Sequence, residues 1–303
     1  MRIVFMGTPD FAVRSLERLY NDDCDVVGVY TQPDKPRNRG MKFSFSPVKS
    51  LALMHNTPVY QPVSLKNEES INIFRDIDCD LLVVVAYGRI LPKEFLDIPK
   101  MGAINIHGSL LPKYRGAAPI QWAILNGENI TGVTSQFVAE EVDSGDIILS
   151  KETLIGDDET SGDLFERLSV LGAELLSDTV RLIKNGTAPR VPQDISLVTY
   201  APIITKEMTH IDWTKTAIEI NNKVRALAPK PSAVTVFDDL IIKIFRVDTG
   251  ATTSITDLKP GTVVSKGKSG IEISCADGTV FIKELQAPGG KRMNAADFLR
   301  GRQ

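Results

Sequence analysis

The first two thirds of the chain alternates short, uninterrupted apolar runs with segments of helical periodicity. A strand that is apolar at every position is buried on both faces, which is typical of parallel strands covered by helices on either side of one sheet. We therefore predict an α/β fold built on an open, doubly wound and mostly parallel sheet. Its predicted strands are residues 3–6, 25–30, 80–86 and 103–107.

The last of these predicted strands contains two polar residues, Asn105 and His107, in an otherwise apolar run. Side chains alternate along a strand, so these two point to the same face. The strand ends at His107, and sites in such sheets lie beyond the carboxyl ends of the strands. An imidazole and a carboxamide placed in this way can both donate hydrogen bonds to one developing oxyanion.

Asp143, in the stretch 142–146, is the candidate acid for this pair. Its carboxylate can hold the imidazole or raise its proton affinity. A lone histidine at a strand end is more often a structural residue, but its pairing with an asparagine and the Ser-Leu-Leu-Pro turn after it favour a site. We therefore predict that Asn105, His107 and Asp143 form a catalytic trio.

A second domain is predicted after residues 186–205, which contain three prolines and little periodicity. Beyond a helix predicted at 214–227, short alternating runs at near-regular spacing indicate a small β-barrel. We predict a catalytic domain at 1–188, a linker at 189–205 and a smaller β-barrel domain at 206–303. The barrel strands are expected at residues 233–237, 240–247, 261–265, 270–275 and 279–285.

The two parts of the chain differ in charge, although the net charge of the whole is only -3. Residues 1–205 carry 20 basic and 27 acidic side chains, whereas residues 206–303 carry 15 basic and 11 acidic ones. A basic C-terminal part on an acidic protein fits the binding of a polyanion. Ordinary variation of surface charge explains the difference equally well.

Composition argues against a membrane protein and against a disulfide or metal framework. The chain has no apolar run long enough to span a bilayer. Cys24, Cys79 and Cys275 are isolated from one another in sequence, which disfavours a disulfide network or a zinc site. A reducing cytoplasm is the expected setting, and no metal ligand set is predicted.

Several longer motifs accompany the predicted site. Asn-x-His at 105–107 is followed by Ser-Leu-Leu-Pro-Lys-Tyr-Arg-Gly at 109–116 and by Val-Asp-Ser-Gly at 142–145. Together these motifs resemble the folate-dependent formyltransferase family. Gly-Thr-Pro-Asp-Phe-Ala at 7–12 is most similar to the members of that family that act on an aminoacylated initiator tRNA. The likeness runs nearly from end to end.

The resemblance implies a Rossmann-like formyltransferase domain followed by an OB-like barrel, a fold that often contacts nucleic acid. It implies transfer of the formyl group of N10-formyltetrahydrofolate (10-formyltetrahydrofolate) to the α-amino group of methionyl-initiator-tRNA, for translation initiation. No metal or redox cofactor is required, because the folate brings the carbon at the right oxidation level. We expect a cytoplasmic monomer that binds this tRNA and the folate but no membrane.

The resemblance also implies where the folate binds. The segment after the third predicted strand would line the pterin pocket, mostly through main-chain hydrogen bonds, and the Ser-Leu-Leu-Pro turn would shape the same cleft. From the residues alone, the first segment is equally well explained as a buried loop that anchors the next helix. The expected folate-binding residues are Arg89, Ile90, Leu91, Ser109, Leu110, Leu111 and Pro112.

The polar, basic stretch 33–46 is long for a simple connection. A solvated loop is the default interpretation, whereas the resemblance implies a grip on the acceptor stem, with Arg39 and Lys42 on RNA phosphates. The chain departs from the family at Met41-Lys42, where two adjacent lysines are common. Lys206, after the predicted linker, would also reach the RNA, or else it forms a salt bridge in the linker.

Three other functions remain open from the sequence. Formyltransferases that act on glycinamide ribonucleotide or on amino-sugar nucleotides share the same trio. The first typically lack a C-terminal barrel, and the second often carry a dehydrogenase domain that this chain lacks. A non-catalytic folate- or RNA-binding regulator would not need Asn105, His107 and Asp143 together.

Overall fold

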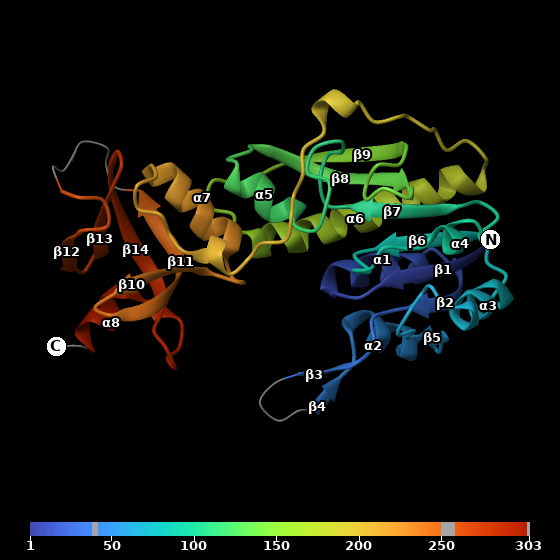
Figure 1. Cartoon of the computed structure of the whole chain (residues 1–303), viewed down its shortest axis with the longest axis horizontal. Coiled ribbons are helices and arrows are strands. Elements are labelled where there is room, and N and C mark those ends of the chain that lie inside the picture. The colour runs from blue at the N-terminus through green and yellow to red at the C-terminus, as the bar shows by residue number, and fades with distance from the viewer. Residues whose placement is uncertain (38–41, 250–257, 302–303) are drawn as a thin grey trace. The chain divides into compact units, whose positions relative to one another are not determined.

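The structure is a computed structural model that describes residues 1–37, 42–249 and 258–301. The chain packs as two compact units, each with its own main sheet (Figure 1). Unit 1 and unit 2 are each assembled from three stretches of chain. Unit 1 comprises Met1–Gly116, Ile130–Leu154 and Phe165–Ala201, and unit 2 comprises Ala117–Asn129, Ile155–Leu164 and Pro202–Gln303.

Unit 1 is built on a seven-stranded sheet in the order β5-β2-β1-β6-β7-β8-β9. The first five strands of this order pair in parallel, and β8 and β9 continue the sheet in the antiparallel sense. The predicted mostly parallel α/β sheet is confirmed. The strands are β1 Arg2–Gly7, β2 Asp25–Tyr30, β5 Val59–Tyr60, β6 Leu81–Val85, β7 Ala103–His107, β8 Ile130–Phe137 and β9 Ile147–Leu154.

Helices pack on this sheet because alternate residues of its central strands are buried on opposite sides. Val4 of β1 lies in one core with Phe74 and Phe95, which two short helices supply. A separate contact joins Phe11 and Phe165, whose ring centroids lie 5.2 Å apart in an edge-to-face arrangement. The helices are α1 Asp10–Asn21, α2 Pro47–Met54, α3 Glu68–Asp76, α4 Lys93–Leu96, α6 Ser161–Lys184, which begins in unit 2, and the 3-10 helix η1 Ile195–Leu197.

The carboxyl ends of β1, β2 and β6 meet at one edge of the sheet. The Thr8 hydroxyl and the Gln32 side-chain amide each donate to the Tyr87 carbonyl over 3.1 Å. Gly7 lacks a side chain where a Cβ would lie 2.7 Å from Ala12 Cβ. Because β7 pairs in parallel with β6, its carboxyl end lies at the same edge.

Residues 33–46, predicted as one long loop, contain a short hairpin. Strand β3 Lys35–Arg37 pairs antiparallel with β4 Lys42–Ser44. Strands this short carry no periodic pattern that the sequence could reveal. Of the two residues predicted here to contact RNA, Arg39 lies outside the described residues and Lys42 begins β4.

Residues 189–201, which the sequence assigned to a linker, pack within unit 1. Val191 forms a bridge with Ile147 of β9, and Arg115 donates its backbone N–H to the Thr199 carbonyl over 2.9 Å. Extended backbone pairing of this kind leaves most side chains exposed, so it produces no apolar periodicity. The segment therefore resembles a linker in sequence although it is bonded to unit 1.

Unit 2 contains an antiparallel sheet in the order β10-β11-β14-β13-β12, with β15 paired to β14. The predicted fold class, an α/β domain followed by a smaller β domain, is confirmed. Residues 233–237 and 270–275 are strands with the predicted bounds. The strands are β10 Ala233–Phe237, β11 Leu240–Thr249, β12 Val263–Gly267, β13 Gly270–Cys275, β14 Gly278–Gln286 and β15 Met293–Asn294.

The main helix of unit 2 begins at Ala217 rather than at the predicted Thr214. The Thr216 side chain accepts from the Glu219 backbone N–H while the Glu219 carboxylate accepts from the Thr216 backbone, a capping box that fixes the start. Thr214 donates to Asp212 in the preceding turn instead. The helices of the unit are α5 Pro119–Leu125, the 3-10 helix η2 Glu207–Thr209, α7 Ala217–Leu227 and α8 Ala295–Arg300.

The core of unit 2 is formed by the inner face of its sheet together with α7 and α8. Ile220 and Val224 of α7 and Phe298 of α8 lie in one buried cluster with Ile242 and Ile282 of the sheet. Within the described part of the chain, none of the helices combines the length and apolar character that a membrane span needs.

Candidate active site

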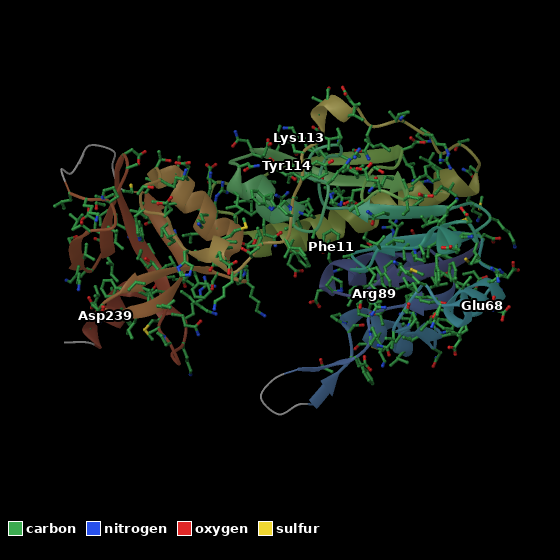
Figure 2. The ribbon with its side chains drawn as sticks, in the orientation of Figure 1. Phe11, Glu68, Arg89, Lys113, Tyr114 and Asp239 are labelled. Atoms are coloured by element: carbon green, nitrogen blue, oxygen red, sulfur yellow. The ribbon has the colours of Figure 1, made fainter. Side chains whose placement is uncertain are left out.

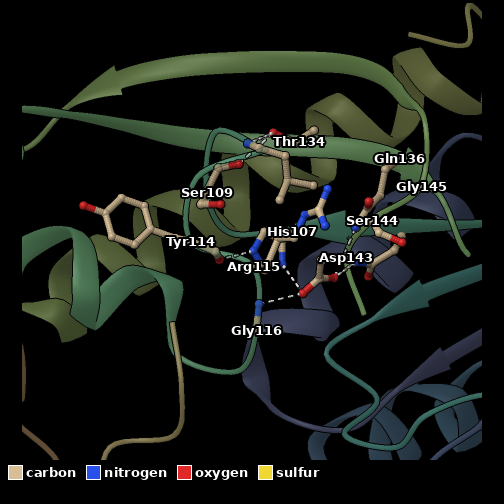
Figure 3. A network of polar contacts seen from close by, with 12 residues as sticks. His107, Ser109, Tyr114, Arg115, Gly116, Thr134, Gln136, Asp143, Ser144 and Gly145 are labelled. Atoms are coloured by element: carbon tan, nitrogen blue, oxygen red, sulfur yellow. Dashed lines mark hydrogen bonds and ion pairs between the residues drawn. The ribbon is translucent and has the colours of Figure 1, made fainter. Parts of the chain in front are cut away.

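The carboxylate of Asp143 collects four donors at the carboxyl end of β7 (Figure 3). Asn105 Nδ2 lies 3.2 Å from Oδ1, and Gln136 Nε2 lies 3.1 Å from the same oxygen. The Gly116 backbone N–H donates to Oδ2 over 2.8 Å, and His107 Nδ1 lies 3.6 Å from Oδ2. These five residues are called the Asp143 cluster. The structure thus brings the predicted trio together.

His107 is 6% exposed, and both of its ring nitrogens face acceptors. Nε2 lies 2.9 Å from the Tyr114 carbonyl oxygen, which can only accept, so Nε2 carries a proton. Nδ1 faces the Asp143 carboxylate, so the imidazolium form donates on both sides. The ring can therefore donate a hydrogen bond to a bound substrate only if the substrate takes the place of the Tyr114 carbonyl or of the Asp143 carboxylate.

Two neighbouring strands place the amides of the cluster. Asn105 of β7 pairs directly with Gln136 of β8 in the antiparallel register, and His107 pairs with Thr134. Gln136 is 1% exposed and Thr134 is fully buried. Gln136 was not predicted, because its neighbours Thr134 and Ser135 are also polar and it does not stand out in the sequence as Asn105 does.

Thr134 fixes the turn after β7. Its hydroxyl donates to the Ser109 carbonyl over 2.7 Å and accepts from the Leu111 backbone N–H over 3.1 Å. Ser109 in turn donates to the Lys113 carbonyl over 2.7 Å. The Ser-Leu-Leu-Pro turn is therefore bonded internally and to β8, and Leu111 is buried within it.

The loop that carries Asp143 is confined by its backbone. Asp143 has a φ of 53°, in the left-handed region that few non-glycine residues adopt. A Cβ on Gly145 would lie 1.7 Å from the Phe137 carbonyl oxygen, so only glycine fits there. Backbone strain of this kind persists where surrounding contacts hold it, and it is concentrated at functional sites.

The side chain of Arg89 does not point to an open site. Its guanidinium donates to Gln32 Oε1 over 3.0 Å and to the carbonyls of Pro62 and Val63 over 2.9 and 2.8 Å. Arg89 can be followed in Figure 2. The guanidinium thus fixes its own segment to two other loops of unit 1. The next residue, Ile90, is 71% exposed.

A cavity of about 200 Å³ lies at the other end of β7, beside the residues that follow β8. The Arg190 guanidinium stacks over the Phe137 ring at 3.6 Å from its centroid on one side of this cavity. None of the seven predicted folate residues is among the described residues that line it. The lining residues are Lys93, Leu96, Asp97, Gly102, Ala103, Phe137, Val138, Ala139, Glu140 and Arg190.

A second polar cluster, the Asp34 cluster, consists of Asp34, Lys49 and Gln61. The Lys49 ammonium contacts the Asp34 carboxylate and donates to Gln61 Oε1 over 2.7 Å. Gln61 Nε2 donates to Asp34 Oδ1 over 2.9 Å. The hydrogen bond from Lys49 holds the pKa of the Asp34 carboxyl below its usual range, against the opposing effect of burial. This is a fixed ion pair with no titratable imidazole in it.

Lys206, predicted to contact RNA, is exposed in unit 2 just before η2. Its backbone carbonyl accepts from the Thr209 hydroxyl over 2.6 Å.

Among the described residues, no group of three His, Cys, Asp or Glu side chains is arranged to hold a metal ion.

Solved structures share this fold. The sugar 3N-formyl transferase WlaRD, solved in the presence of dTDP and 5-N-formyl-THF, superposes with a TM-score of 0.68 at 21% identity over 97% of this chain and 98% of that one. HypX from Aquifex aeolicus, solved in complex with tetrahydrofolic acid, gives 0.64 at 19% identity. The match includes 99% of this chain but only 47% of the HypX chain. At these identities the likeness concerns the fold alone.

Sequence comparison is more specific. Residues 1–180 match the formyl transferase family model, and residues 203–303 match the model of the formyl transferase C-terminal domain. A methionyl-tRNA formyltransferase of Clostridioides difficile (strain 630) is 46% identical over 301 residues, which is 99% of this chain and 97% of that protein. The chain therefore belongs to the formyl transferase family, in the group of the methionyl-tRNA formyltransferases.

Proposed function

We propose that the protein transfers the formyl group of N10-formyltetrahydrofolate to the α-amino group of methionyl-initiator-tRNA, giving the N-formylmethionyl-tRNA that starts translation. The observation that carries this proposal is the Asp143 cluster, in which a carboxylate joins Asn105 and His107 at the end of β7. It stands in a chain that is similar over nearly its whole length to a protein named for this activity.

The amine nitrogen attacks the formyl carbon, and the carbonyl oxygen becomes an oxyanion as the new C–N bond forms. Asn105 Nδ2 carries two hydrogens and uses one on Asp143, so the other is directed to the oxyanion. His107 donates the second bond when its Nε2 exchanges the Tyr114 carbonyl for the substrate oxygen. Each such donor contributes roughly 2.7–4 kcal/mol in a preorganised site.

Asp143 is proposed to carry a proton from the attacking amine to the departing folate nitrogen. The attacking amine loses a proton as the tetrahedral intermediate forms, and N10 of the folate gains one when the C–N10 bond breaks. Asp143 orients His107 and passes this proton through water. A tetrahydrofolate with a free N10–H and a formylated amine are the products. The residues take no part in redox chemistry, because the folate brings the carbon at the oxidation level of the product.

The folate is proposed to bind through main chain at Arg89, Ile90 and Leu91 and against the turn at 109–112. The bonds of the Arg89 guanidinium to two other loops support this assignment, because they fix the segment whose peptide groups would meet the pterin. The bonds of Ser109 to Lys113 and of Leu111 to Thr134 hold the 109–112 turn in place, and this turn supplies a second preformed wall.

The tRNA is proposed to contact unit 2 and the 33–46 stretch, with Lys206, Arg39 and Lys42 on phosphates. We predict that Lys206→Ala raises the KM for tRNA and lowers the slope of log affinity against log salt by about one, while the KM for the folate stays unchanged. Lys215→Ala is the matched control, because that exposed lysine is already paired with Glu219. An unchanged salt slope would mean that Lys206 contacts no phosphate.

A direct assay tests the whole proposal. Purified protein and the folate donor are offered charged initiator tRNA, free methionine, glycinamide ribonucleotide, an amino-sugar nucleotide and small amines. We expect fast transfer to the charged tRNA alone. Faster transfer to the ribonucleotide or to the amino-sugar nucleotide would mean that this compound, and not the charged tRNA, is the acceptor. Folate binding without transfer to any of these amines would favour a non-catalytic regulator. The same preparation checks the proposed monomeric state by sedimentation; the cytoplasm is the proposed location.

A further inference from the structure

The stretch 181–202 lies between the segments matched by the two family models. In this stretch, both the nitrogen and the oxygen of the Gln193 side-chain amide form hydrogen bonds. Gln193 Nε2 donates to the Asp143 carbonyl over 2.9 Å and to the Gly145 carbonyl over 2.8 Å. Gln193 Oε1 accepts from Arg115 Nε over 3.0 Å and from Nη2 over 2.8 Å. Gln193 is also half-buried in a stretch whose other side chains are mostly exposed.

The orientation of this amide is determined by its partners. A guanidinium only donates and a carbonyl only accepts, so Oε1 must face Arg115 and Nε2 must face the loop. Arg115 is itself 5% exposed, and its Nη1 lies 3.9 Å from Glu141 at the start of the same loop. The amide therefore joins a buried cation to two backbone carbonyls of the loop that carries the catalytic candidate.

Gln193 reaches the Asp143 carboxylate by a second route. Its Nε2 lies 3.2 Å from Gln136 Oε1, and Gln136 Nε2 donates to Asp143 Oδ1 over 3.1 Å. Asp143 is thus held at its backbone by Gln193 and at its carboxylate by a residue that Gln193 orients. Because Asp143 has a positive φ, its position depends on such contacts more than that of a relaxed residue would.

We infer that Gln193 is a positioning residue for the transfer reaction, which sets the place of the Asp143 carboxylate against His107 and Asn105. This inference rests on the proposed function. It extends the site into residues 181–202, to which neither family model reaches. Gln193 touches no reacting atom. Its replacement is therefore expected to lower kcat indirectly, by displacing Asp143.

The test compares Gln193→Glu and Gln193→Ala with Ile195→Ala, a control two residues away whose side chain is 85% exposed. The glutamate keeps the acceptor for Arg115 but sets an oxygen against two carbonyl oxygens. We expect both Gln193 variants to lower kcat about 10- to 100-fold, with both KM values near wild type. Ile195→Ala should match wild type. Where Gln193→Ala fails to fold, Gln193→Glu carries the test through its retained pair with Arg115.

A double-mutant cycle separates positioning from a merely structural role. In an Asp143→Ala background, Gln193→Glu should cause no further loss of kcat, because the group that it positions is gone. A full, additive loss in that background, an unchanged kcat in the single variants, or a loss confined to the KM for tRNA would each overturn the inference. A wild-type protein that is inactive on every acceptor would instead overturn the proposed function itself.

Discussion

The carboxylates of Asp143 and Asp34 both lie beyond strand ends of unit 1, and each accepts several hydrogen bonds. Asp34 faces the Lys49 ammonium in an ion pair. Asp143 faces two neutral amides, a backbone N–H and the imidazole of His107, a ring whose nitrogens can either donate or accept a hydrogen bond. The first arrangement holds a charge in place, whereas the second can move a proton. The two carboxylates therefore differ both in the number and in the kind of their partners.

The largest expected contrast comes from removing each carboxylate in turn. We expect Asp143→Ala to lower kcat about 10²- to 10⁴-fold, because the imidazole loses its orienting acid, while the protein stays folded. Asp34→Ala should keep kcat near wild type but lower the thermal midpoint, because Lys49 is left unpaired at 14% exposure. Steady-state rates and calorimetry measure both. An Asp143→Ala variant that is nearly as active as wild type would end the proposed mechanism.

A smaller contrast comes from the amides. Asn105→Ala should lower kcat about 10²-fold through the loss of one donor to the oxyanion. Gln61→Ala removes the equivalent amide-to-carboxylate bond from the Asp34 cluster and should leave kcat unchanged. Single-turnover rates with saturating folate and tRNA give the comparison. Equal losses in the two variants would mean that the Asn105 amide acts only through the fold.

The smallest effect concerns pH. The pKa of Asp34 is depressed in the folded protein, so its pairing stabilises the fold above the unfolded aspartate pKa of about 3.9, and that stability is lost as pH falls through the folded value. We expect Lys49→Met to lower the thermal midpoint by several degrees at pH 7. The gap to wild type should narrow as the pH approaches about 3. A gap that stays constant with pH would assign the loss to packing of the lysine stem.

The sequence predicted those parts of the site that depend on local periodicity. The two-residue spacing of Asn105 and His107 in an apolar run was sufficient to place both on one face of β7. The approach of Asp143 depends on a loop 38 residues from Asn105 along the chain. Asp143 could be named from the sequence as the candidate acid, but no local periodicity predicts how closely its carboxylate approaches His107 and Asn105.

Other parts of the structure left no local signal. Gln193 sits in an irregular, proline-containing stretch, and its bonds to backbone carbonyls need no partner of a particular type. The hairpin β3–β4 is too short for alternation to register, and α7 begins at its capping box rather than at the first residue of helical periodicity. Contacts with a distant main chain, short strands and competing caps are the features that a single sequence conceals.

Because the chain passes between the two units several times, the order of synthesis limits when each unit can fold. Helix α5 packs against α7 in unit 2, yet a long stretch of unit 1 separates them in sequence. A ribosome releases α5 first, so its contact with α7 cannot form until α7 has been synthesised. Unit 1 can close once residue 201 has emerged, whereas unit 2 also needs its later strands and helix α8. Synthesis that stalls in between therefore leaves a nascent chain in which α5 lacks its contact with α7.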